Sequence, residues 1–250
     1  MKIAVVTGAS SGIGEATARE LARRGWKPLL LARRRERLEQ LAAELGGEYE
    51  VCDVSERAEV ERAAAAILGR HPRIDLLVNN AGIPGRADFL SLDHERIEAV
   101  MRTNYFGGVW MVRALEAGLQ PGSHVVNVVS VAGTVAFAPA GPYAASKHAQ
   151  LAFSRSLTGL LAGRGVKVHT VLPGFVETEG FPQKTVLRSR FFRGAVVQPE
   201  LVAERIVKAV ESGKRELFVP RWYRAFSLLQ ALLPGVSARM VARSGYKRPA

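Results

Sequence analysis

The sequence contains little cysteine, few aromatic residues and no long apolar run. Cys52 is the single cysteine in 250 residues, which excludes an intrachain disulfide framework and a metal site built on clustered cysteines. We predict no metal site. No apolar segment approaches the ~18 residues that a membrane-spanning helix needs. The four apolar residues after Lys2 are too few for a secretory signal, so we expect a cytoplasmic location.

Acidic residues are also scarce: 23 Asp and Glu stand against 35 Lys and Arg, for a formal net charge of +12. The imbalance is concentrated in residues 180–198 and 220–250, which contain ten cations and no acid. Neither stretch has a basic run long enough for a nucleic-acid-binding arm, and aromatic residues do not interleave with a basic stripe elsewhere. We therefore predict no nucleic-acid partner and assign the charge to one insertion and one tail.

Short apolar runs alternate with amphipathic segments along the chain. Strands are predicted at 3–6, 28–32, 49–52, 74–78, 124–129, 166–172 and 216–219, and helices at 13–24, 34–45, 56–68, 94–118, 143–161 and 199–212. Strands this apolar are buried on both faces, as in a parallel sheet covered by helices. Right-handed crossovers then give an α/β, Rossmann-like doubly wound sheet of about seven strands in the order 3-2-1-4-5-6-7, with helices on both faces.

A glycine-rich turn follows the first predicted strand and opens the first helix. Its G-x3-G-x-G pattern comprises Gly8, Ser10, Ser11, Gly12, Ile13 and Gly14. Glycines let the backbone turn sharply and approach a pyrophosphate, which then meets the free N–H groups of the helix N-terminus. The pattern favours a dinucleotide site over an ordinary strand-to-helix turn.

The second predicted strand ends at Arg33 and Arg34. An acid at this point would bind a ribose 2′-hydroxyl, whereas arginine suits the 2′-phosphate of NADP. We therefore predict NADP(H) in preference to NAD(H). The alternative is a solvated helix start, although cations there oppose the helix dipole. Asp53 and Val54, after the third strand, are predicted beside the adenine, and Asp53 equally suits the cap of the next helix.

Tyr143 and Lys147 are spaced at i, i+4 and share one face of a predicted helix. A free tyrosine has a pKa of about 10, and a nearby ammonium and a cationic nicotinamide would bring it toward neutrality. Ser130 ends the fifth predicted strand, where sheet C-termini face the ligand crevice. Its hydroxyl would hold a substrate oxygen beside Tyr143, or would only cap a turn.

Several short motifs follow one another along the chain. They are Thr7-Gly8-x3-Gly12-x-Gly14, Asn79-Asn80-Ala81-Gly82, Asn104, Ser130, Tyr143-x3-Lys147 and Pro173-Gly174. Over about residues 1–220 the chain resembles the short-chain dehydrogenase/reductase family in its shorter, cytosolic-type form. The resemblance implies an NAD(P)-dependent oxidoreductase that acts on a CH–OH or C=O group and assembles as a homodimer or homotetramer.

The resemblance also implies the roles of individual residues. The general acid/base would be Tyr143, with Lys147 binding the nicotinamide ribose, Ser130 orienting the carbonyl and Asn104 holding a water in the proton relay. Further cofactor contacts would come from Asn80, Ala81, Gly82, Pro173, Gly174, Val176 and Thr178.

The leading hypothesis is an NADP(H)-dependent oxidoreductase that interconverts a carbonyl and a secondary alcohol. A non-catalytic NADP-binding regulator and a membrane-associated lipid or acyl-carrier ketoreductase are the alternatives. The substrate loop at 175–198 carries Phe181, Phe191 and Phe192 with four cations, which suits a hydrophobic carbonyl compound with or without an anionic group. Val131, Ala132 and Val135 are expected to line the same cleft, together with Phe137 and Ala138.

Residues 221–250 depart from the shortest family members. We divide the chain into a dinucleotide-binding domain at 1–220 and a basic amphipathic extension at 221–250. Aromatic residues and leucines between Trp222 and Leu233 predict an amphipathic helix. Its apolar face suits a lid or a subunit contact, which we favour; the alternative is a membrane-surface contact through 221–243.

Overall fold

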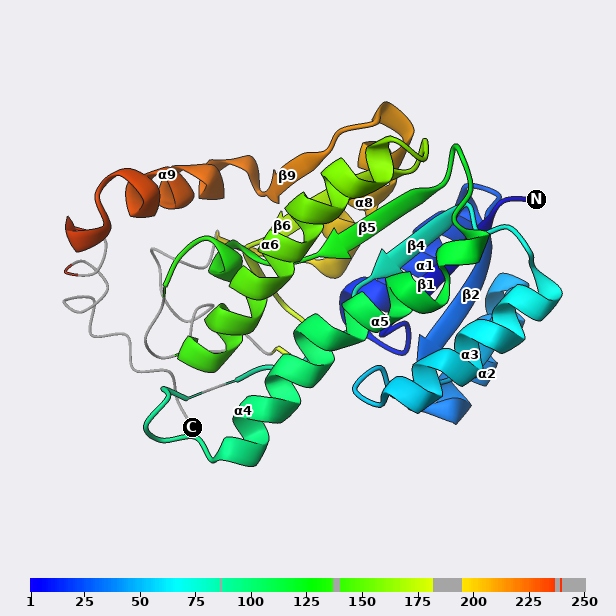
Figure 1. Cartoon of the computed structure of the whole chain (residues 1–250), viewed down its shortest axis with the longest axis horizontal. Helices are drawn as coiled ribbons and strands as arrows, with labels where there is room; N and C mark the ends of the chain where they lie inside the picture. The colour runs from blue at the N-terminus through cyan, green and yellow to red at the C-terminus, as the bar shows by residue number, and fades with distance from the viewer. Residues whose placement is uncertain (86, 137–139, 182–194, 237–238, 240–250) are drawn as a thin grey trace.

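Seven parallel strands form the middle layer of the structure, a computed structural model that describes residues 1–85, 87–136, 140–181, 195–236 and 239 (Figure 1). The strands are β1 (Ile3–Thr7), β2 (Lys27–Ala32), β3 (Glu48–Val51), β4 (Leu76–Asn79), β5 (His124–Val128), β6 (Lys167–Pro173) and β9 (Glu216–Val219). Their spatial order is β3-β2-β1-β4-β5-β6-β9. β9 corresponds to the seventh predicted strand, at 216–219. The predicted fold class and the predicted order 3-2-1-4-5-6-7 are therefore confirmed.

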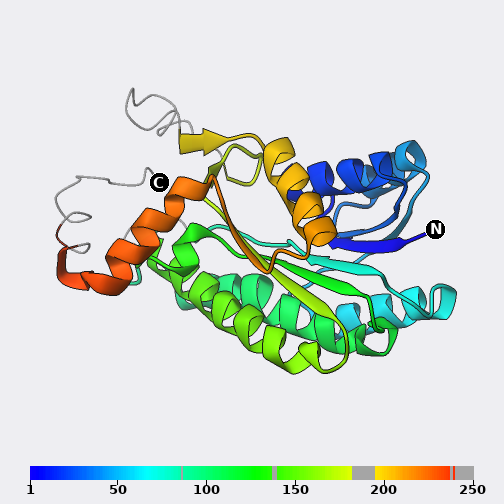
Figure 2. The same cartoon turned by 90° about the horizontal axis from the view of Figure 1, so that it is seen from above.

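Helices cover both faces of this sheet (Figure 2). One face packs against α1 (Gly12–Arg23), α2 (Arg35–Leu45) and α8 (Pro199–Ser212), and the other against α3 (Arg57–Arg70), α5 (Gly107–Ala114) and α6 (Gly141–Ala162). Neighbouring strand residues supply the two cores alternately: Leu30 faces the first, while Leu29 and Leu31 face the second. This double burial explains why the strands are continuous apolar runs.

The segment predicted as one helix at 94–118 is helical, but it is not α-helical throughout. The segment divides into α4 (His94–Met101), a π-helical turn (Arg102–Phe106), α5 and a 3-10 turn (Glu116–Gly118). The π-helical turn contains the buried Asn104, whose side chain exchanges hydrogen bonds with the backbone of Ile83. The widened turn therefore accompanies an inward polar side chain, a common feature of functional sites.

Two further elements complete the described chain. A small parallel sheet pairs β7 (Phe175–Val176) with β8 (Val196–Val197), and the predicted tail helix is present as α9 (Arg224–Leu232). A 3-10 turn (Arg221–Tyr223) joins β9 to α9. The division of the chain at residue 220 stays a prediction.

Candidate active site

A cleft with a volume of about 470 Å³ lies at the carboxyl ends of the central strands. Its wall brings together most of the predicted site residues, which are Gly8, Ser10, Ser11, Gly12, Ile13, Arg33, Arg34, Asp53, Val54, Asn80, Ala81, Gly82, Ser130, Tyr143, Lys147, Pro173, Gly174, Val176 and Thr178. Gly14 and Asn104 lie behind this wall. Segments distant in sequence therefore converge at the edge where parallel sheets bind ligands.

The glycine turn needs its glycines for space and for conformation. Gly8 and Gly12 have φ angles of 65° and 58°, in the left-handed region. A Cβ atom on Gly14 would lie 2.3 Å from the carbonyl oxygen of Gly8. The turn is tied to the end of β4, because Asn80 Nδ2 donates to the Thr7 carbonyl oxygen at 3.0 Å. This cradle, at the N-terminus of α1, fits a dinucleotide pyrophosphate.

Arg34 connects the glycine turn to the segment after β7. Its Nε donates to Ser10 Oγ at 3.1 Å, and its Nη1 lies 3.1 Å from both carboxylate oxygens of Glu179. Arg37 reaches the same carboxylate at 2.7 Å. Hydrogen bonds from Arg34 and Arg37 hold the pKa of Glu179 below its usual range. The Glu179 carboxylate therefore lies where the sequence predicted the 2′-phosphate of NADP.

Arg33 and Asp53 face each other at the same end of the cleft, with Arg33 Nη1 3.5 Å from Asp53 Oδ2. The alternative role of Asp53 as a helix cap was wrong, because α3 begins at Arg57 with Glu56 as its N-cap. Asp53 Oδ1 instead accepts hydrogen bonds from the backbone N–H and the hydroxyl of Ser55, which turns the chain before α3.

Lys147 is buried against the end of β5. Its Nζ donates to the Val128 carbonyl oxygen at 3.1 Å and to Gln150 Oε1 at 2.7 Å, and it lies 5.8 Å from the centre of the Tyr143 ring. Burial lowers the pKa of the Lys147 ammonium to about 7, while both oxygen acceptors favour its charged form. The Tyr143 ring also packs against Phe181, with ring centres 5.6 Å apart.

Ser130 caps a turn and also lines the cleft, while its role toward a substrate oxygen stays a prediction. Its Oγ accepts the N–H of Ala132 at 3.1 Å, which caps the 3-10 turn Val131–Gly133. The same Oγ lines the cleft and lies 3.4 Å from the Pro173 carbonyl oxygen, to which it donates. Because the Pro173 contact is long, the hydroxyl can turn toward a ligand oxygen without losing its accepted bond.

Asn104 lies directly behind Gly82. Its Oδ1 accepts the N–H of Ile83 at 2.8 Å, and its Nδ2 donates to Ser146 Oγ at 3.0 Å. A Cβ on Gly82 would lie 3.3 Å from Asn104 Oδ1 and 3.8 Å from Lys147 Nζ. Asn104, Gly82 and Lys147 are therefore neighbours, as their predicted roles require.

Several expectations about the substrate side need correction or fall outside the described residues. Val131, Ala132 and Val135 do not line the described cleft; Val131 packs instead against the small core around Val129. Phe137, Ala138, Phe191, Phe192 and the four loop cations lie outside the described residues.

The sequence interpretation also missed residues that contact the site. Glu179 and Arg37 were not proposed, although Glu179 is the last acid before the basic stretch and Arg37 follows Arg34 by one helical turn. Gln150, three residues after Lys147, was missed because its spacing gives no chemical signal until the buried ammonium beside it is seen.

Comparisons with known proteins identify the family. A model of the short chain dehydrogenase family matches residues 2–186, and the chain belongs to this family. A putative ketoacyl reductase of the granaticin polyketide synthase of Streptomyces violaceoruber is 36% identical over 221 residues, covering 85% of this chain and 80% of that protein. The expected oxidoreductase class is confirmed.

Two solved structures extend the likeness to the fold. A variant of actinorhodin polyketide ketoreductase with NADPH superposes with a TM-score of 0.78 at 32% identity, covering 87% of this chain and 95% of that one. A short chain dehydrogenase/reductase from Burkholderia phymatum in complex with NAD gives a TM-score of 0.81 at 27% identity, with 92% of each chain covered. The first of these structures contains NADPH and the second contains NAD.

Proposed function

We propose that the protein is an NADP(H)-dependent oxidoreductase that interconverts a carbonyl and a secondary alcohol, with Tyr143 as general acid/base. The observation that carries this proposal is the buried Lys147 ammonium, 5.8 Å from the Tyr143 ring centre in the cleft that also holds the glycine turn. The likeness to polyketide ketoreductases supports the same reaction. A regulator that only binds NADP could use Lys147 to hold the cofactor ribose, but it would have no need for the Tyr143 hydroxyl beside it.

The chain's own residues would divide the chemistry between them. In the reductive direction the bound nicotinamide cofactor supplies a hydride to the carbonyl carbon. Tyr143 gives its phenolic proton to the carbonyl oxygen, so that the product is a neutral alcohol. Lys147 stabilises the resulting phenolate by its charge. Ser130 Oγ donates to the substrate oxygen in place of the Pro173 carbonyl, and Asn104 holds a water that returns a proton to Tyr143.

The cofactor preference rests on Arg34 and its surroundings. The site fits a phosphate because Arg34 and Arg37 already bind two oxygens of one anion, the Glu179 carboxylate. We infer that the 2′-phosphate of NADP(H) replaces Glu179 there, with Arg33 adding a third positive charge. NAD(H) has no 2′-phosphate to take the place of Glu179 on these arginines, so it leaves that ion pair in place and gains no such contact, and NADP(H) binds preferentially.

Arg34→Ala is therefore expected to raise the KM for NADPH about tenfold or more, because a charged hydrogen bond of about 1.5–3 kcal/mol is lost. The KM for NADH should change little. Arg155→Ala is the matched control: Arg155 also pairs with both oxygens of a carboxylate, Glu216, and neither residue lines the cleft. Equal changes for both cofactors would contradict the preference.

The substrate class proposed is a small hydrophobic carbonyl compound, supported by Phe181 in the cleft beside Tyr143. An acyl-carrier substrate is the second candidate, favoured by the ketoacyl reductase relative. NADPH oxidation across ketones, aldehydes and acyl thioesters separates the two, and no oxidation of NADPH with any of them would favour the regulator. We also propose a cytoplasmic homodimer or homotetramer, to be measured by light scattering.

A further inference from the structure

The helix α9 turns its polar side toward the body of the protein and its apolar side outward. Ser227 forms a hydrogen bond with Thr134 Oγ1, and Tyr223, one turn earlier, is buried and donates to the Ala195 carbonyl oxygen at 3.1 Å. No residue of α9 itself is buried. A helix that only covered a core would have the opposite orientation.

The outward side of α9 and of the turn before it carries exposed apolar side chains, which we call the α9 patch. Its members are 43–75% exposed and are Trp222, Phe226, Leu228, Leu232 and Leu233. The aromatic members contact each other, with ring centres 5.9 Å apart. Figures 1 and 2 show α9 at the edge of the molecule, projecting from the end of β9. Exposed apolar side chains that gather on one side of a helix are typical of a binding surface.

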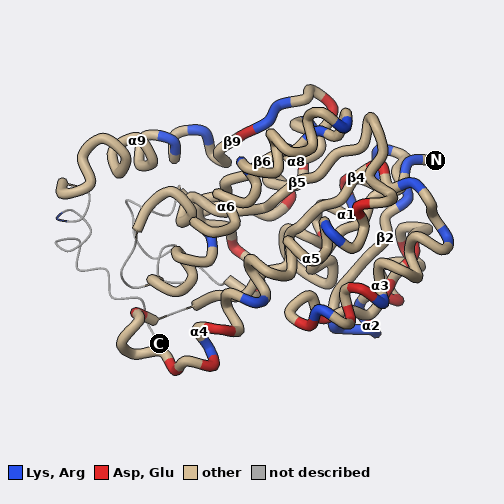
Figure 3. Tube along the Cα trace, in the orientation of Figure 1, with Lys and Arg blue, Asp and Glu red and all other residues tan. Residues whose placement is uncertain are grey.

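The positive charge beside the α9 patch favours a negatively charged partner. Arg221 and Arg224 flank its first turn, and no acidic residue follows Glu216 to the end of the sequence. The same stretch contains four more cations. In Figure 3 the trace of α9 shows blue near its start and no red. A second copy of this chain would bring the same positive charge to the contact and repel it. An anionic phospholipid surface instead complements both the apolar side and the arginines.

We propose that the α9 patch docks the protein on the surface of an anionic phospholipid bilayer. Trp222 and Phe226 lie at the level of the lipid headgroups, Leu228 and Leu232 enter the acyl boundary, and the arginines pair with lipid phosphates. The contact is peripheral: within the described part of the chain, no helix combines the length and apolar character that a membrane crossing requires. Docking here is independent of the chemistry proposed for the cleft.

The test is co-sedimentation of the full chain with two kinds of vesicle, equal parts phosphatidylglycerol and phosphatidylcholine, or phosphatidylcholine alone. Wild type is expected to partition at least about tenfold more strongly onto the anionic vesicles, and to be released by salt. Leu228→Ser combined with Leu232→Ser should lower that partition at least about tenfold, since both leucines leave the acyl boundary. Arg221→Gln combined with Arg224→Gln should reduce the preference for anionic vesicles.

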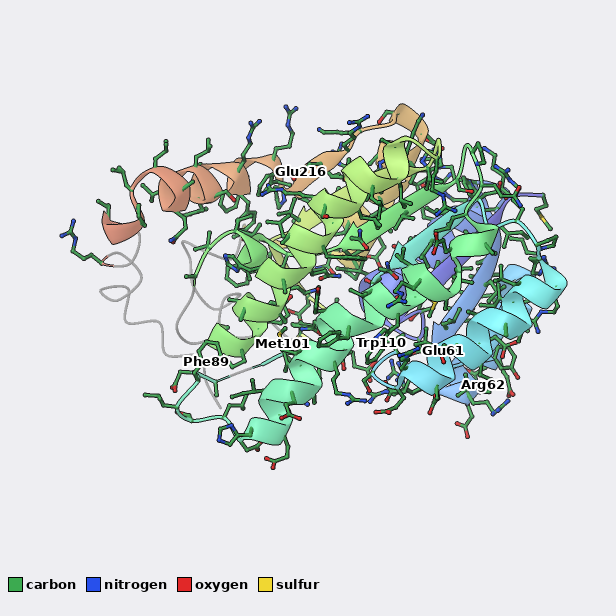
Figure 4. All side chains as sticks on the ribbon, in the orientation of Figure 1. Glu61, Arg62, Phe89, Met101, Trp110 and Glu216 are labelled. Carbon is green, nitrogen blue, oxygen red and sulfur yellow. The ribbon has the colours of Figure 1, made fainter. Side chains whose placement is uncertain are left out.

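The matched control is Leu90→Ser, which removes a fully exposed leucine (99%) from another surface. Its neighbour Phe89 packs at the start of α6, beside Gly141, and lies well apart from α9 in Figure 4. Leu90→Ser should sediment like wild type, and all variants should keep the wild-type melting temperature.

Failure to bind anionic vesicles overturns the proposal. A double-leucine variant that binds like wild type overturns it too. If wild type does not bind vesicles and the double-leucine variant loses its oligomeric state, the α9 patch is a subunit contact. A raised substrate KM in solution, again without vesicle binding, assigns it to a lid. Reductase activity in solution is measured separately, so its absence leaves the docking result readable.

Discussion

Gly14→Ala is the sharpest test of the glycine cradle. The added methyl carbon would lie 2.3 Å from the Gly8 carbonyl oxygen and 2.6 Å from Asn80 Nδ2. Neither neighbour moves freely, because Gly8 holds a left-handed turn and Asn80 Nδ2 is bonded to the Thr7 carbonyl oxygen. The backbone must therefore open by several tenths of an ångström, at a typical overpacking cost of about 1–3 kcal/mol.

Gly159→Ala supplies the matched control. Gly159 lies inside α6, and a Cβ there meets nothing within 4 Å. This substitution should stabilise the protein by about 0.5–1 kcal/mol, because alanine loses less backbone entropy in a helix. At about 2–4 °C per kcal/mol for a chain of this size, its Tm should rise by about 1–4 °C, while that of Gly14→Ala should fall by up to about 12 °C.

Differential scanning calorimetry measures these shifts, and isothermal titration calorimetry measures NADPH binding to the same proteins. Gly14→Ala should bind NADPH about tenfold more weakly or worse, since the displaced turn carries the N–H groups that face the pyrophosphate. Gly159→Ala should bind it unchanged. Equal Tm and equal NADPH affinity for the two variants would refute the steric reasoning about the cradle.

Three further outcomes follow from the same contacts. Glu179→Gln should lower the Kd for NADPH about two- to fivefold and leave the Kd for NADH unchanged, because it removes an exposed carboxylate that competes weakly for Arg34. Glu216→Gln is the control. A weaker NADPH affinity of Glu179→Gln would contradict this competition. Gln150→Leu removes an acceptor of the Lys147 ammonium, so the alkaline limb of kcat/KM, which we attribute to loss of that charge, should move about one unit to lower pH. If the alkaline limb stays at the wild-type pH, Gln150 has only a structural role. Burial raises the pKa of the Cys52 thiol to about 12. Alkylation of Cys52 at pH 8 should therefore be slow in the native protein and fast in guanidinium. Fast alkylation of the native protein would show that the end of β3 opens.

The sheet could be predicted from sequence because its apolar runs report burial on both faces directly. Leu29, Leu30 and Leu31 illustrate this, since each is 1% exposed or less. The glycine turn and Tyr143-x3-Lys147 were also recognisable, because phosphate approach and phenolate stabilisation need those residue types at short spacing.

The rest depends on contacts between distant segments. The π-helical turn around Asn104 accompanies hydrogen bonds to Ile83, 21 residues away, which no periodicity reports. Glu179 lies 142 residues from Arg37 along the chain, so their ion pair was invisible in the sequence. The outward apolar side of α9 was equally hidden, because amphipathicity predicts a helix without saying which side packs on the body.

The comparison of Tyr143→Phe with wild type in NADPH-dependent ketone reduction tests the proposed chemistry most directly. Tyr49→Phe is the matched control, since its hydroxyl bonds to Glu39 and it does not line the cleft. Tyr143→Phe should lower kcat by about 10²–10⁴-fold, the usual contribution of a general acid, with NADPH affinity and Tm near those of wild type. A Tyr143→Phe enzyme as active as Tyr49→Phe would contradict the assignment of Tyr143 as the proton donor.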